Sequence, residues 1–277
     1  MEKLDFLIIG AQKSATTSLR SFLSEGHDGI YMHHTELHFW NRDNQYQDGQ
    51  GLEAYLQNFS GASSNQIVGE KSPSYLPSEV CATRIADHFP KVKLIAILRN
   101  PAERAYSAFW HGKRVGAISQ SMSFGESIRK YRENSGTPYG DLITQGFYAR
   151  HLTRYLDHFP REQLKIMDFK ATKQDTSNQL AGVLDFLLPE GSNSKKNLNF
   201  PKQNVASVSR VPSFSEFIHK NKLLKYETKS RILKKVSVVF EPPMMLEEDA
   251  KFLAEIYALE NEKLNLLTGI DFNSVIE

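Results

Sequence analysis

The sequence predicts an α/β fold, in which a central parallel sheet is flanked by helices. Three observations support this prediction: short continuous apolar runs, amphipathic segments between them, and a chain of 277 residues of which 40% are hydrophobic and 24% charged. Strands that alternate with helices favour a parallel sheet, and this composition is typical of a folded globular protein. We expect a single domain that spans residues 1–277.

Two apolar runs predict strands that are buried on both faces of the sheet. Residues 4–9 form the first run, which ends at Gly10, and residues 93–98 form the second. Continuous apolar stretches of this length are typical of strands inside parallel sheets. A helical pattern begins near Thr16 after the first run. Another follows Pro101 after the second run, and proline suits the first turn of a helix.

Shorter patterns predict the remaining elements. Two further strands are expected at residues 66–70 and 164–169. Helices are expected at residues 78–89, 105–111, 147–159, 176–187 and 247–267. The polar segments 112–146 and 189–212 are expected to be lids or excursions on the substrate side, because long loops in compact domains are often functional.

Composition and charge narrow the classes of function. With 34 Lys and Arg against 32 Asp and Glu, the net charge of +2 lacks the strongly basic balance of a dedicated nucleic-acid-binding protein. No apolar run approaches the roughly 20 residues of a membrane-spanning helix, and residues 1–10 lack the basic start of a signal peptide. One cysteine, Cys81, cannot form an internal disulfide and fits a reducing compartment. We therefore expect a cytoplasmic protein with no membrane span and no nucleic-acid partner.

The strongest local motif follows the first predicted strand. After Gly10 and Ala11, the residues that lead into the helix are Gln12, Lys13, Ser14, Ala15, Thr16, Thr17 and Ser18. Backbone N–H groups at a helix N-terminus, a lysine and short hydroxyl side chains together make a cradle for an anion. The alternative is a Ser/Thr helix cap beside an exposed lysine. A Walker A loop is disfavoured because Lys13 lies three positions beyond Gly10 instead of six, which argues against an ATP- or GTP-hydrolysing enzyme.

At these residues the chain resembles the sulfotransferases that use PAPS (3′-phosphoadenosine 5′-phosphosulfate), whose phosphosulfate loop reads roughly G-x-x-K-[ST]-G-T-[TS]. Residues 10–17 match it except at Ala15, where the family usually has glycine and where a left-handed backbone would be costly for alanine. Residues 99–107 match a second family motif, R-x-P-x-x-R-A-[YF]-S. The resemblance implies that Arg99 and Ser107 bind the 3′-phosphate and that the fold is a three-layer, P-loop-like one.

The resemblance is most specific to the branch of heparan sulfate sulfotransferases and related bacterial enzymes. Residues 35–40 resemble its K-E-x-H-F-F motif, and residues 68–75 match its G-E-K-[ST]-P-x-Y motif. Residues 146–164 fit a third stretch. Thr35 stands where this branch usually has lysine, which suggests a less anionic acceptor than a sulfated glycan.

The resemblance and the residue chemistry assign catalytic roles. Glu36 occupies the position of the branch's catalytic glutamate and is expected to be the general base, with His38 as a second candidate or an orienting group. Lys13 is expected to stabilise the leaving PAP and Lys71 to contact the transferring group, so that no metal is required. His111 matches a histidine that some members place near the acceptor. Structural alternatives remain open: a capping role for Glu36, a structural His38 and a surface position for His111.

A basic segment is expected to close over the 3′-phosphate, as in the family. The candidates are residues 202–210, with Lys202 and Arg210, or residues 234–235. The sequence does not decide between them.

The predicted function is transfer of a sulfuryl group from PAPS to a hydroxyl, or less readily an amine, of a small-molecule or carrier-protein-bound acceptor. A nucleotide-dependent phosphotransferase and a non-catalytic PAP-binding protein are the alternatives. An acidic carrier protein would dock on basic residues. The candidates for that contact are Lys113, Arg114, Arg129, Lys130 and Arg132.

Overall fold

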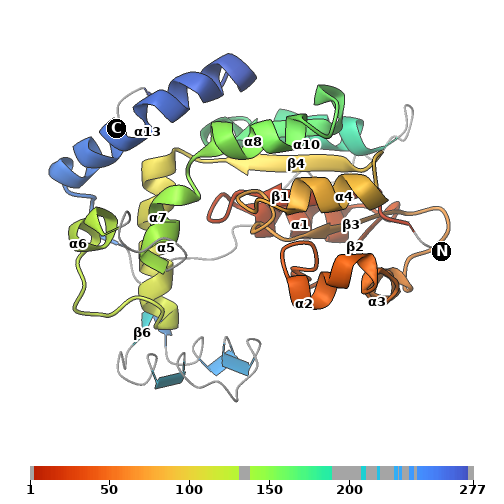
Figure 1. Ribbon diagram of the computed structural model, residues 1–277, viewed down its shortest axis with the longest axis horizontal. Helices are drawn as coiled ribbons and strands as arrows, with labels where there is room; N and C mark the ends of the chain where they lie inside the picture. Colours follow the sequence, from red (N-terminus) through yellow and green to blue (C-terminus); the bar gives the residue numbers. More distant parts are fainter. Residues whose placement is uncertain are drawn as a thin grey trace. The chain divides into compact units, whose positions relative to one another are not determined.

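The computed structural model describes most of the chain and divides it into two compact units (Figure 1). The described residues are 3–130, 138–188, 207–209, 217–218, 228–229, 231–232, 237–239 and 242–273. The first unit comprises Met1–Arg99, Tyr148–Gln203 and Lys263–Ile270, and the second comprises Asn100–Phe147, Asn204–Glu262 and Asp271–Glu277. The expected single domain stays a prediction.

The first unit contains a five-stranded parallel sheet with the order β2-β3-β1-β4-β5. Its strands are β1 (Phe6–Gly10), β2 (Ile30–Met32), β3 (Ile67–Lys71), β4 (Lys93–Leu98) and β5 (Leu164–Asp168). After β1 the chain forms the edge strand β2 and then β3, which pairs between β2 and β1. It then crosses to the other side of β1, where β4 and β5 complete the sheet. Ligands of open parallel sheets bind beyond the carboxyl ends of the strands at such a reversal of strand order, which directs attention to the segment after β1.

Helices cover the sheet of the first unit. They are α1 (Thr16–Gly26), α2 (Asp43–Tyr46), α3 (Leu52–Leu56), α4 (Cys81–His88), α8 (Tyr148–Leu156), α9 (Phe169–Gln174) and α10 (Thr176–Leu187), with 3-10 turns at Gln47–Gly49, Gln57–Phe59 and Arg161–Gln163. Phe6 and Ile8 of β1 pack with apolar residues of α1 and α10 in one core cluster. The intervening Leu7 and Ile9 are equally buried. Every residue of β1 is therefore buried, as the continuous apolar run predicts.

The predicted strands and the fold class are confirmed. Two close contacts explain why glycine stands at residue 10 of β1 and at residue 69 of β3. A Cβ at Gly10 would lie 2.7 Å from Leu76 Cβ, and one at Gly69 would lie 2.4 Å from the ring of Phe6. Real side chains do not approach so closely, so glycine allows the chain after β3 to pack against β1.

The second unit is largely helical. Its elements are α5 (Pro101–Val115), α6 (Phe124–Arg129), α7 (Pro138–Thr144), most of α13 (Glu247–Thr268) and an antiparallel pair, β6 (Ser207–Ser209) with β7 (Ser237–Val239). Phe109, Ile143, Leu253 and Tyr257 belong to its core cluster. Within the described residues of the whole chain, no helix is long and apolar enough to cross a membrane.

Helix α5 runs past residue 112, where the sequence suggested that a polar excursion begins. Gly112 and Lys113 are buried residues of this helix, which continues to Val115 and is capped by Gly116 with a φ of 77°. Glycine in the left-handed conformation is a common way to end a helix. Residues 112–115 therefore belong to α5, and the role of residues 112–146 as a lid or excursion stays a prediction.

Candidate active site

The loop after β1 has a backbone geometry that is compatible with the predicted anion cradle. Lys13 has a φ of 70° and Ala15 a φ of 62°. These left-handed residues turn the chain so that α1 begins at Thr16. Ala15 is the N-cap residue and provides no side-chain hydrogen bond, and the first turn carries no acidic residue. The alternative of a Ser/Thr cap is therefore wrong, and the positive end of the helix dipole has no side-chain cap.

Residues of this loop fit a bound phosphate group. The hydroxyl of Ser14 is buried and has no hydrogen-bond partner among the described residues. Thr16 and Ser18 are buried, Lys13 and Thr17 are half-buried, and Gln12 is exposed. Buried polar groups normally have partners. An uncapped helix N-terminus beside such a hydroxyl matches the donors that an anion requires.

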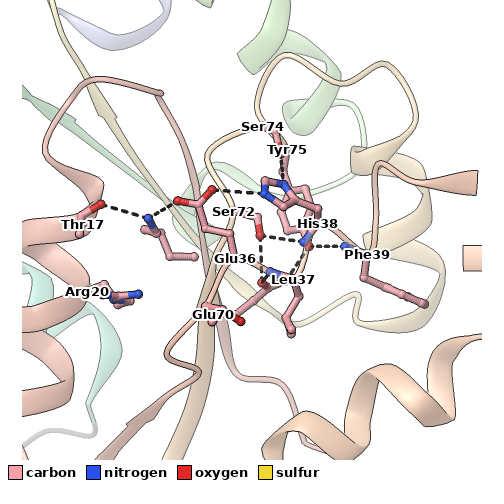
Figure 2. Close-up of polar contacts among 12 residues, drawn as sticks. Thr17, Arg20, Glu36, Leu37, His38, Phe39, Glu70, Ser72, Ser74 and Tyr75 are labelled. Carbon is pink, nitrogen blue, oxygen red and sulfur yellow. Dashed lines mark hydrogen bonds and ion pairs between the residues drawn. The ribbon is translucent and has the colours of Figure 1, made fainter. Parts of the chain in front are cut away.

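Three side chains meet beside this loop at the carboxyl end of β3. The amine of Lys71 forms an ion pair with Glu36 and donates a hydrogen bond of 3.1 Å to Thr17 Oγ1, in the first turn of α1. His38 Nε2 lies 3.3 Å from the other carboxylate oxygen of Glu36, and its Nδ1 lies 2.8 Å from Ser74 Oγ (Figure 2). Glu36 is thus an ion-pair partner and does not cap a helix.

Burial and neighbouring charge shift the pKa of Glu36 in opposite directions. Partial burial raises the pKa of this carboxyl, but the hydrogen bond with His38 and the charge of Lys71 outweigh it and lower the pKa to about 2. At Lys71, burial outweighs the attraction of Glu36 and lowers the pKa of the amine. Only 3% of the Lys71 side chain is exposed, against 37% for Glu36. An ionised carboxylate therefore faces solvent above a buried cation.

Sequence reasoning missed Glu70, the residue before Lys71. Its carboxylate is completely buried. It accepts hydrogen bonds from the hydroxyls of Tyr55, Ser72 and Tyr75 and from the main-chain N–H of Leu37. An acid at the end of a predicted buried strand, within the G-E-K motif, was the available signal.

Comparison with known proteins identifies the family. The model of the sulfotransferase domain matches residues 3–262. The chain belongs to the sulfotransferase family. It is 31% identical over 193 residues to the bifunctional heparan sulfate N-deacetylase/N-sulfotransferase 1 of Xenopus laevis, and 31% identical over 197 residues to the human N-deacetylase/N-sulfotransferase 2. These matches cover 65% and 66% of this chain but 22% of each relative, so the chain matches about a fifth of their length.

Solved sulfotransferases share the fold. A sulfotransferase from Alicyclobacillus acidocaldarius superposes with a TM-score of 0.73 at 25% identity, over 98% of both chains. The mouse sulfotransferase SULT7A1, solved with PAP, gives 0.56 at 16% identity, over 96% of this chain and 86% of that one. The predicted family, the P-loop-like α/β fold, the enzyme class and PAPS as the family's sulfuryl donor are confirmed.

The other predicted site residues of this sulfotransferase lie in different parts of the chain. Arg99 follows β4 in the first unit, and its guanidinium lies over the ring of Phe169, 5.1 Å from the ring centre. Ser107 and His111 belong to α5 in the second unit and are half-buried. The joint binding of a 3′-phosphate by Arg99 and Ser107 stays a prediction. Lys202 and Arg210 lie outside the described residues, as do residues 234–235.

The basic residues proposed to dock a carrier protein differ in exposure: Arg129 and Lys130 are exposed, whereas Arg114 is half-buried. Lys113 is buried, donates to the carbonyl of Gln120 and lies over the rings of Phe109 and Trp110. Its apolar stem and amine therefore contact the core of the second unit, and its docking role stays a prediction. Arg129 is bound to the buried carboxylate of Asp249 at 2.8 Å. Arg132 lies outside the described residues.

Proposed function

We propose that this sulfotransferase transfers the sulfuryl group of PAPS to a hydroxyl, or less readily an amine, with Glu36 as the general base. One observation carries the proposal: Glu36, His38 and Lys71 meet beside the first turn of α1, next to the uncapped phosphate loop. Sulfuryl transfer requires a base at the acceptor and positive charge near the leaving group, and this cluster supplies both.

In the proposed reaction, each residue of the cluster and of the phosphate loop has a separate role. PAPS supplies an activated sulfuryl group whose bond to the 5′-phosphate breaks as the bond to the acceptor oxygen forms. The loop that contains Lys13 would hold the 5′-phosphate and stabilise the charge that it gains. Lys71 would bind an oxygen of the sulfuryl group. Glu36 would accept the proton of the acceptor hydroxyl, and His38, fixed by Ser74, would orient that carboxylate.

The ion pair with Lys71 explains how Glu36 becomes a base. A carboxyl with a pKa of about 2 is a weak proton acceptor at neutral pH. If the amine of Lys71 turns toward a bound sulfuryl group, the carboxylate loses its closest positive charge, and its pKa rises. The pair would therefore hold Glu36 ionised before the donor binds, and separation of the pair on donor binding would increase the basicity of Glu36.

The proposed acceptor is a hydroxylated small molecule or an acyl chain that is bound to a carrier protein. It rests on Thr35, which replaces the lysine usual in the glycan-sulfating branch. A phosphotransferase and a non-catalytic PAP-binding protein remain the alternatives. The non-Walker loop weighs against the first, and the assembled base and cation weigh against the second.

Calorimetric titration with PAP, ADP and ATP tests the cofactor. We expect PAP to bind at least about tenfold more tightly than ADP, a difference of about 1.4 kcal/mol, because the 3′-phosphate adds an anionic contact. Equal affinities for PAP and ADP, or a preference for ATP, would support the phosphotransferase and remove our proposal.

Turnover of PAPS with a phenol, a primary alcohol and an amino sugar tests the base. We expect Glu36→Gln to bind PAP as the wild type does but to lose about 10²- to 10⁴-fold in turnover. Glu53→Gln, an exposed glutamate of α3, is the matched control and should keep full activity. PAP binding without PAPS turnover for any acceptor would favour the PAP-binding protein.

A further inference from the structure

Four consecutive residues of the catalytic segment, defined as residues 36–40, are held by side chains on or near β3. Each donates one hydrogen bond. The donor and acceptor pairs are Leu37 N to Glu70 Oε2 (3.4 Å), His38 N to Ser72 Oγ (3.1 Å), Phe39 N to Tyr75 OH (3.0 Å) and Trp40 Nε1 to Tyr55 OH (3.3 Å). Figure 2 shows the first three of these residues beside Glu70 of β3 and Ser72 and Tyr75, which follow that strand. This segment carries Glu36 and His38, so its position sets the position of the proposed base.

All four connections end at one carboxylate. The hydroxyl of Ser72 donates to Glu70 Oε2 at 3.0 Å, and those of Tyr55 and Tyr75 donate to Glu70 Oε1 at 3.0 and 2.7 Å. Leu37 reaches Glu70 directly, and each of the other three residues of the segment reaches it through one hydroxyl. Glu70 therefore accepts four hydrogen bonds while it is 0% exposed.

The direction of these bonds requires an acceptor at their end. An amide or indole N–H can only donate, so each hydroxyl accepts from the segment and has its own hydrogen left to donate. An ionised carboxylate offers acceptor sites for all four donors and no hydrogen of its own. Burial raises the pKa of Glu70 above its ordinary value, and the hydrogen bonds from Tyr75, Tyr55, Ser72 and Leu37 offset this rise only in part.

The backbone of the segment needs such support. His38 has a φ of 55°, a conformation that residues other than glycine adopt rarely and that the surroundings must hold in place. We propose that Glu70 is a positioning residue, whose buried carboxylate fixes residues 37–40 and thereby aims Glu36 and His38 at the acceptor. This inference rests on the proposed function for its catalytic consequence.

Glu70→Gln tests the inference with little change in volume. The substitution replaces one acceptor oxygen with an NH₂ group, which meets hydroxyls that also donate. We expect the kcat of PAP release from PAPS, measured with the fastest acceptor of the panel, to fall about 100-fold, because a small misplacement of a reacting group has effects of this size. The KM for PAPS and the affinity for PAP should stay within about threefold. Hydrogen exchange at the amides of residues 37–39 should become faster.

Two tyrosines provide a matched pair if Glu70→Gln does not fold. Tyr75→Phe removes the hydroxyl between Phe39 and Glu70. Tyr155→Phe removes an equally buried hydroxyl, which donates to the carbonyl of Tyr75 at 2.9 Å. We expect Tyr75→Phe to lower kcat about tenfold and to speed exchange in the segment, whereas Tyr155→Phe should change neither.

The possible outcomes separate this inference from the proposed function. Wild-type kcat and wild-type exchange in Glu70→Gln, or equal behaviour of the two tyrosine variants, would overturn the positioning role. A wild-type protein that neither binds PAP nor consumes PAPS would refute the proposed function. In that case the exchange rates alone would still decide whether Glu70 holds the segment.

Discussion

Glu36 and Lys71 show how burial and an ion pair balance differently at the two partners: the pair dominates at Glu36, and burial dominates at Lys71. The charge of Lys71 and the hydrogen bond of His38 lower the pKa of Glu36 to about 2, although burial alone would raise it. Burial lowers the pKa of Lys71 more than Glu36 raises it. The half-exposed carboxylate gains from the pair, whereas the buried amine remains a poorly solvated cation. Such a cation is suited to bind an anionic group of a substrate.

The pair predicts a pH-dependent contribution to stability. Because the pKa of Glu36 is lower in the folded state than in the unfolded chain, its ionised form stabilises the fold above its ordinary value of 4.5. This contribution is lost as the pH falls from about 4.5 through about 2. We therefore expect the melting temperature of Glu36→Gln to lie below that of the wild type at pH 6, and the difference to shrink toward pH 2.

Thermal unfolding followed by circular dichroism between pH 2 and pH 7 measures this difference. Glu53→Gln is again the control, because it removes an exposed glutamate of α3 that lies outside the Glu36–Lys71 pair. A Glu36→Gln difference that stays constant down to pH 2 would contradict the assigned pair.

At the scale of elements, the left-handed backbone of the phosphate loop indicates that one substitution, at Ala15, should stabilise the protein. Ala15 has a φ of 62°, and the left-handed conformation costs an L-residue about 1–2 kcal/mol. Glycine removes this cost but loses more freedom on folding. We therefore expect Ala15→Gly to stabilise the protein by about 0.5–1 kcal/mol, and the melting temperature to rise by about 1–4 °C.

An alanine-to-glycine substitution in a helix should have the opposite effect and lower the stability of the protein. Ala54 is an exposed residue of α3, where glycine costs about 1 kcal/mol relative to alanine. A calorimetric scan of both variants against the wild type makes the comparison. A lower melting temperature for Ala15→Gly than for the wild type would show that the left-handed backbone is not strained.

Elements with strong local patterns could be predicted from the sequence, and those fixed by distant contacts could not. The runs at β1 and β4 are long and apolar, and their strands lie where the sequence predicts them. The strand Ile30–Met32 has three residues and is specified by its pairing with β3, which no local pattern reveals. Glu70 was missed for the same reason, since its donors come from residues up to 33 positions away.

At the scale of the whole molecule, the predicted site residues belong to two compact units. The phosphate loop, Glu36, His38, Lys71 and Arg99 lie in the first, and Ser107 and His111 lie in the second. The family motifs group these residues by sequence, but a motif does not specify how separate units are arranged. Titration of the whole chain with PAP therefore tests the predicted residues of both units together.

We expect PAP to stabilise the transition in which the first unit unfolds, because residues 10–18 belong entirely to that unit. A ligand that binds only the native state at 100 times its Kd adds about 2.7 kcal/mol. This corresponds to a rise in melting temperature of about 5–10 °C for a chain of this size. Scanning calorimetry with PAP and with ADP measures the shift, and ADP at the same concentration should give a smaller one.

Two lysines distinguish specific binding from general charge effects in that experiment. Lys13→Ala should abolish the shift with PAP, because it removes the cation of the phosphate loop. Lys91→Ala removes an exposed lysine that precedes β4, at the amino ends of the parallel strands and so opposite the phosphate loop, and should preserve the shift. An equal loss in both variants would mean that PAP binds through diffuse positive charge, and the phosphate loop would then lose its assigned role.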